Sequence, residues 1–103
     1  MEIEEIQNKV TEFEEKRARL KDYHIKEELI LIHLMEELGE LSTQVMNKHA
    51  RPDRYNKENM KEEVCDIILI CLHLAKILDM NLSNELINKL NILNKRLDNN
   101  TPQ

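Results

Sequence analysis

The scarcity of residues that turn the chain is the feature that most limits its fold. One glycine, Gly39, and two prolines, Pro52 and Pro102, occur in 103 residues. A multi-stranded sheet needs clusters of turn residues between its strands, and neither proline lies in such a cluster. The length is that of one domain. We therefore predict an all-α fold, organised as a single domain over 1–103.

Apolar residues recur every three or four positions along four segments, which is typical of amphipathic helices. The predicted helices span 2–20, 25–49, 57–79 and a last segment that ends in a frayed tail at 99–103. Pro52 disfavours helical geometry at Arg51, and either Asp53 or Asn56 is expected to cap the third helix. Ser83 is expected to cap the fourth. Its predicted inward stripe consists of Leu86, Ile87, Leu90, Leu93 and Leu97.

The third helix contains VCDIILICLHLAKIL, which is apolar on nearly every side and is expected to be buried on nearly every side. Asp66, His73 and Lys76 interrupt it, and it falls short of the roughly 20 apolar residues of a membrane span. Cys65 and Cys71 point in different directions on this helix, so we expect reduced core cysteines. Because a short chain buries only a modest share of its surface, we predict a four-helix bundle completed by a homodimer or homotetramer.

The charge of the chain argues against a nucleic-acid strand as its partner. The formal net charge is −5, with 34% charged residues and no basic block of the kind that follows a phosphate backbone. The N-terminal sequence MEIEEIQNKV lacks the basic start and apolar run of a signal peptide. We expect a cytoplasmic protein that binds neither nucleic-acid strands nor membranes.

Acidic residues occupy helical positions close to apolar stripes. In HLMEELGEL, Glu36, Glu37 and Glu40 lie on one narrow face of the second helix. In KEEVCDIIL the same offsets recur on the third helix, at Glu62, Glu63 and Asp66. Asp66 is the most informative of these, since Asp is a poor helix former and lies here among apolar neighbours. We expect the two acidic faces to meet.

Carboxylates gathered in an apolar setting repel one another unless a cation is bound between them. Oxygen ligands alone suit Mg²⁺, or Mn²⁺ as the alternative ion, whereas zinc prefers His or Cys. Magnesium keeps waters and binds phosphate, so the predicted reaction is phosphoanhydride hydrolysis, with a carboxylate positioning or deprotonating the attacking water. The candidate catalytic carboxylates are Glu36, Glu37, Glu40 and Glu62.

These motifs resemble those of the MazG-like all-α nucleotide pyrophosphohydrolases, in which an ExxE pair is followed after a spacer by an ExxD pair. The pairs here are Glu37-Leu38-Gly39-Glu40 and Glu63-Val64-Cys65-Asp66, and the resemblance extends over about 20–97. It implies that Glu37, Glu40, Glu63 and Asp66 ligate Mg²⁺. It also implies that a nucleoside triphosphate is cut between its α and β phosphates, to a monophosphate and pyrophosphate, as in nucleotide-pool sanitation.

The resemblance further implies phosphate-binding groups near the end of the last helix. The candidates are Lys89, Asn94, Lys95 and Arg96; relatives often carry Asn, a basic residue and Tyr where this chain has Asn94-Lys95-Arg96-Leu97. Tyr23 and His24 precede the second helix and are candidates for lining a nucleotide site. His33 and His73 are expected to take part in helix packing instead.

Two other interpretations stay open beside this hydrolase. Phosphoribosyl-ATP pyrophosphatase activity belongs to the same fold. A non-enzymatic interaction module, with acidic helix faces that meet a basic partner, would explain the charge and the periodicity. It would leave unexplained why acids recur at identical offsets on two helices. A di-iron carboxylate bundle is disfavoured, because its usual Glu-x-x-His motif is absent.

Overall fold

Helices make up most of the described chain. The computed structural model describes residues 2–100, and no strand occurs among them, which confirms the predicted all-α class. Its elements are α1 (Ile3–Leu20), α2 (Glu27–Ala50), the short 3₁₀ helix η1 (Pro52–Arg54), α3 (Lys57–Ile77) and α4 (Leu82–Asn100). Of the predicted tail, 99–100 belong to α4 and 101–103 lie outside the described residues. None of the described helices has the length and apolarity needed to cross a membrane.

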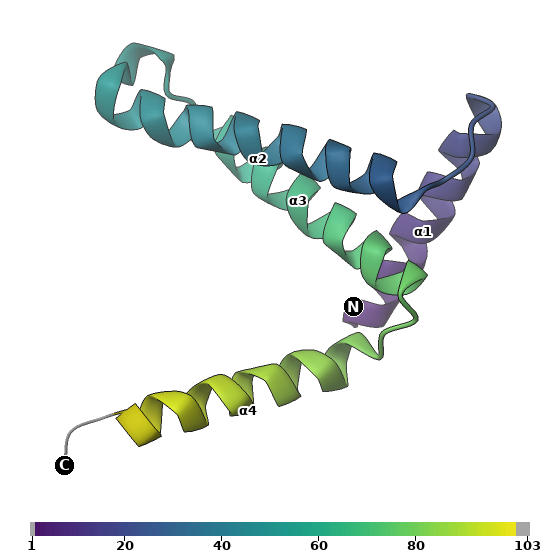
Figure 1. The fold of residues 1–103 in the computed structure, drawn as a ribbon. Helices are drawn as coiled ribbons and strands as arrows, with labels where there is room; N and C mark the ends of the chain where they lie inside the picture. The colour runs from purple at the N-terminus through teal and green to yellow at the C-terminus, as the bar shows by residue number, and fades with distance from the viewer. Residues whose placement is uncertain (1, 101–103) are drawn as a thin grey trace.

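Helices α2 and α3 form an antiparallel hairpin, with η1 at its tip (Figure 1). Asn56, one of the two predicted caps, begins α3: its side chain accepts a hydrogen bond of 3.1 Å from the backbone N–H of Asn59. The backbone N–H of Asn56 in turn donates to Gln44 Oε1 at 3.0 Å. This second bond ties the start of α3 to the end of α2 and so helps to fix the register of the hairpin.

Helix α1 crosses α3 near its C-terminal end, and the core of the chain lies there (Figure 1). The buried apolar side chains at this crossing are Val10, Leu72, Ala75 and Leu82. Gln7 is buried beside them and its Nε2 donates a hydrogen bond of 3.2 Å to the Leu72 carbonyl. His73 is only 4% exposed, which agrees with the predicted packing position. The hairpin is therefore anchored at its open end, away from η1.

The start of α4 is capped by a side chain from α1. The helix begins at Leu82, so Ser83 is its second residue and the predicted Ser83 cap is wrong. Instead, the Ser83 backbone N–H donates to Glu4 Oε1 at 3.2 Å, which satisfies one of the unpaired N–H groups of the first turn. The bonds from Ser83 hold the pKa of the Glu4 carboxyl below its usual value.

Helix α4 then extends away from the hairpin, so the chain is open (Figure 1). Its radius of gyration is 17.3 Å, against about 13 Å for a compact chain of this length. The predicted inward stripe of α4 is consequently exposed: Leu86, Ile87, Leu90, Leu93 and Leu97 are all 45–67% accessible. The expected closure of the bundle by a second chain stays a prediction.

The outer face of α3 is also uncovered, which corrects two expectations. Val64, Ile68 and Leu69 are 40%, 52% and 37% exposed, so α3 is not buried on nearly every side. Cys65 and Cys71 are exposed thiols, not core residues. The physical reason is the same for both corrections. Within residues 2–100, only α1 and α2 pack extensively against α3, and the fourth helix lies elsewhere.

Truncating the centre of the core tests this arrangement. Leu72→Ala is expected to lower the free energy of unfolding by about 2–5 kcal/mol, because it leaves a cavity between α1 and α3. Leu20→Ala, at a side chain that is 76% exposed, is the matched control and should lower the free energy of unfolding far less. Urea unfolding followed by circular dichroism measures both values. Equal losses in the two variants would contradict the placement of the core.

Candidate metal and nucleotide site

The hairpin brings the two acidic motifs to the same level. Antiparallel neighbours pair at equal distances from their connection, and the pairs Glu37/Asp66 and Glu40/Glu63 are both centred between Arg51 and Pro52. The two ExxE/ExxD faces therefore lie opposite one another across α2 and α3. The predicted meeting of the acidic faces is seen in the structure.

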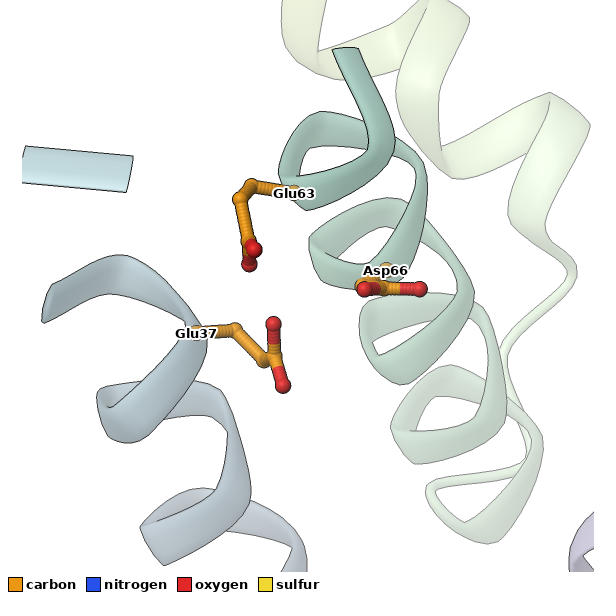
Figure 2. A group of neighbouring side chains, drawn as sticks. All are labelled: Glu37, Glu63 and Asp66. Carbon is orange, nitrogen blue, oxygen red and sulfur yellow. The ribbon is translucent and has the colours of Figure 1, made fainter. Parts of the chain in front are cut away.

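Three of these carboxylates form a compact group. One oxygen from each of Glu37, Glu63 and Asp66 lies within 4.8 Å of the other two. Figure 2 shows the Glu37 and Glu63 side chains pointing toward each other across the gap between α2 and α3, with Asp66 further along α3. Glu37 Oε2 and Glu63 Oε2 are both buried without a hydrogen-bond donor. Such oxygens are costly unless a proton or a cation is shared between them.

The fourth acid of the motifs, Glu40, interacts with the same group. Its contact with Glu63, together with the charge of Glu63, raises the pKa of the Glu40 carboxyl. Contact with Glu37 and loss of solvent raise the pKa of Glu63, and the nearby Asp66 charge adds to this effect. Like charges that oppose one another's ionisation are the electrostatic signature of acids brought together. We refer to Glu37, Glu40, Glu63 and Asp66 as the acidic cluster.

Two sequence-based expectations about these acids need correction or qualification. Asp66 is exposed, not buried among apolar neighbours, although one of its oxygens lies close to Glu37 and Glu63. Glu36 and Glu62 are also exposed, and they lie beside the cluster residues in sequence without belonging to the compact group. Their roles in catalysis stay predictions.

His33 is a site residue that the sequence analysis assigned to helix packing. Its side chain is 38% exposed, and its Nε2 lies 3.3 Å from Glu37 Oε1. One Glu37 oxygen thus faces His33, while the other is buried in the acidic cluster. The signal that could have found this contact is the i, i+4 spacing, which places the two residues on one helix face.

The predicted phosphate-binding residues are not at the cluster within this chain. Lys89, Asn94, Lys95 and Arg96 are exposed on α4, which Figure 1 shows extending away from α2. Tyr23 contributes to the lining of a cavity of about 380 Å³ between α1, α2 and α3, whereas His24 is exposed to solvent. Among the described residues, the structure thus brings together the acids but not the basic groups.

The donor set of the cluster fits a hard divalent cation. It offers carboxylate oxygens from two helices, and its buried unpaired oxygens are the atoms that would ligate Mg²⁺ or Mn²⁺. Neither cysteine is part of the group, and the nearby His33 contacts a carboxylate oxygen. Such a site favours Mg²⁺ over zinc.

Repulsion within the cluster predicts how stability depends on pH and on charge. Because folding raises the pKa values of Glu40 and Glu63, the metal-free protein loses stability as the pH rises from the ordinary glutamate range toward neutrality. At neutral pH in EDTA, Glu40→Gln should therefore raise the melting temperature. Millimolar Mg²⁺ should raise it in the wild type and much less in the variant.

Differential scanning fluorimetry measures these shifts, and Glu12→Gln, at an exposed glutamate in the middle of α1, is the control. This control should keep the wild-type response to Mg²⁺. A Mg²⁺ response that Glu40→Gln leaves intact would contradict the assignment of Glu40 to the cluster.

Comparison with known proteins agrees with the geometry of the acids. Residues 25–96 match the MazG nucleotide pyrophosphohydrolase domain, and all four cluster residues lie inside this range. Neither the curated proteins nor the solved structures contain a significant match to the chain. The matched range covers most of the 103 residues and confirms the resemblance that the motifs indicated. The chain belongs to the MazG nucleotide pyrophosphohydrolase domain family.

Proposed function

We propose that this chain is a Mg²⁺-dependent hydrolase that cleaves nucleoside triphosphates between the α and β phosphates. Membership of the MazG family indicates a nucleotide pyrophosphohydrolase in general. The observation that carries the finer proposal is the acidic cluster, in which two buried carboxylate oxygens lack hydrogen-bond donors. A removal of damaged or surplus nucleotides from the pool is the role that we propose for this reaction.

Each group at the cluster has a distinct part in this proposal. Mg²⁺, when bound, supplies charge neutralisation for the phosphates. Glu37, Glu40, Glu63 and Asp66 would hold it, and the exposure of Asp66 leaves one side of the cluster accessible to a substrate. The attacking water needs a carboxylate that is near the cluster but not consumed by metal binding. Glu36 and Glu62 are exposed next to it and are our candidates for that base.

The triphosphate also needs positive groups, and we propose that a second copy of the chain supplies them. The accessible surface is 8,305 Å², about 2,200 Å² more than the ~6,100 Å² expected for a compact monomer of this mass. That excess is larger than the ~800 Å² per partner of a standard interface. The exposed apolar residues Leu86, Ile87, Leu90 and Leu93 make α4 the element that docks. The same helix carries the candidate phosphate-binding residues Lys89, Asn94, Lys95 and Arg96.

Pyrophosphate release tests the reaction directly. The wild type should release pyrophosphate from at least one member of a panel of NTPs and dNTPs with Mg²⁺, and none with EDTA. Asp66→Asn should lower the rate by about 100-fold or more while leaving the helical content intact, since it removes a charge and preserves shape. Asp53→Asn, at an exposed aspartate of η1, is the control.

Full activity in Asp66→Asn would contradict the role of Asp66. If the chain releases pyrophosphate from phosphoribosyl-ATP and from no NTP or dNTP, phosphoribosyl-ATP would be its substrate in place of the one that we propose. If neither the NTP and dNTP panel nor phosphoribosyl-ATP is cleaved, the result favours the acidic interaction module over the hydrolase.

A paired substitution on α4 tests the assembly. Wild type should be a dimer or tetramer by light scattering. Leu90→Asp should shift it to the monomer and lower activity, because a charge is placed on the docking stripe. Asn91→Asp adds the same charge at the adjacent exposed position and should keep both the mass and the activity. A monomeric and fully active wild type would refute this arrangement.

A further inference from the structure

The cavity that Tyr23 lines opens beside the acidic cluster. Its volume is about 380 Å³, within the range of small-molecule pockets. On α2, His33 lines it and lies one helical turn before Glu37; on α3, Ile70 lines it and lies one turn after Asp66. One turn advances about 5–6 Å along a helix. The cavity is therefore separated from the cluster by a distance that the ribose of a nucleotide can bridge.

The lining has the composition of a site for a flat, partly polar ligand. Its walls are apolar, from Ile25, Leu29, Ile30 and Ile70, and its polar groups come from Glu14, Arg17, Lys26, Tyr23, His33 and His73. Apolar walls with a few convergent polar groups are what a nucleobase needs, since its faces stack and its edge forms hydrogen bonds.

The polar edge of the cavity is held in place by contacts within α1 and its following loop. Arg17 forms an ion pair with Glu14, donates a hydrogen bond from its Nε to Tyr23 Oη at 3.3 Å, and lies over the Phe13 ring at 5.5 Å. Glu14 has a second carboxylate oxygen besides the Oε2 that accepts from Arg17, and Tyr23 accepts from Arg17 while its hydroxyl can still donate a proton. Both donor and acceptor are thus presented in fixed positions.

His73 adds a further polar group at the inner wall. Burial lowers its pKa, so the neutral imidazole offers one donor and one acceptor nitrogen. The charged groups that act on it are Glu14, Glu15 and Arg17, all on α1.

We propose that this cavity binds the base of the nucleotide substrate, and that Glu14, Arg17 and Tyr23 determine which base is accepted. This inference rests on the proposed function and deepens it. The acidic cluster lies inside the range 25–96 that matches the family, whereas these three residues precede it. The reaction is then carried out by the hairpin, and the choice of base is made by α1 and the loop after it.

The test separates base binding from phosphate binding. The probes are non-hydrolysable α,β-imido nucleoside triphosphates with each base, and inorganic tripolyphosphate, titrated calorimetrically into the full chain with Mg²⁺. Arg17→Gln should lower the affinity for the preferred nucleotide by about tenfold, as expected for the loss of a charged hydrogen bond. It should leave tripolyphosphate affinity within about twofold. Arg19→Gln, an exposed arginine two residues away on the same helix, should change neither.

A second variant guards against loss of local structure in Arg17→Gln. Leu29 lines the cavity and is 49% exposed, so Leu29→Trp should fill the cavity with a larger side chain. This variant should lower the affinity for the nucleotide but not the affinity for tripolyphosphate. Leu31→Trp, 52% exposed on the same helix and outside the cavity lining, is its control.

The outcomes distinguish this inference from the proposed function. The base site is refuted if the wild type binds tripolyphosphate and binds no nucleotide more tightly than tripolyphosphate. It is also refuted if Arg17→Gln and Arg19→Gln have the same nucleotide affinity. In either case the hydrolase proposal stands. A change in oligomeric mass in place of nucleotide affinity would make the cavity a contact between chains and would also refute it. If neither tripolyphosphate nor any nucleotide binds with Mg²⁺, the proposed function fails and the base site fails with it.

Discussion

Mutual repulsion among the carboxylates between α2 and α3 is the constraint that most defines the candidate site. The hairpin places two acidic pairs at one level, and no donor in the described chain compensates the inner oxygens of Glu37 and Glu63. Folding therefore works against ionisation of Glu40 and Glu63, as their raised pKa values show. A cation with oxygen preference removes this conflict. Relief of this repulsion would favour binding of the cation.

The rest of the fold anchors this hairpin at one end. Its anchor is the crossing of α1 over α3, where Val10 and Leu72 are buried, and this lies at the end opposite η1. The acids lie between anchor and tip, on a stretch that only α2 and α3 form. Helix α4 is fastened at its first turn by Glu4 and then leaves the hairpin, with its apolar stripe exposed. The exposure of Leu86, Ile87, Leu90 and Leu93 on this stripe is why assembly belongs to our proposal.

Much of this arrangement could be predicted from local sequence. Helical periodicity gave the four helices to within a few residues, and Asn56 was recognisable as a cap because its side chain suits that position. The spacing of acids at identical offsets on two helices predicted that they meet, since a short connection makes neighbouring helices antiparallel. The family resemblance then named the acids that the structure groups together.

Other features depend on where whole helices lie, which periodicity cannot reveal. Asp66, Cys65 and Cys71 follow the pattern of buried residues, yet they are exposed because α4 does not return to cover α3. Ser83 has the side chain of a cap, but a carboxylate from a distant helix takes that place. Nothing in the local sequence distinguishes Glu14 and Arg17 from the other charged residues of α1, whereas the fold places them at a cavity beside the cluster.

A metal site between α2 and α3 can be tested by titration with paramagnetic Mn²⁺, followed by NMR relaxation of backbone amides in the full chain. We expect strong, saturable broadening centred on Glu37, Glu40, Glu63 and Asp66, which excess Mg²⁺ reverses and Glu63→Gln weakens. Broadening spread over the other exposed acids, or unchanged in Glu63→Gln, would contradict a metal site between α2 and α3.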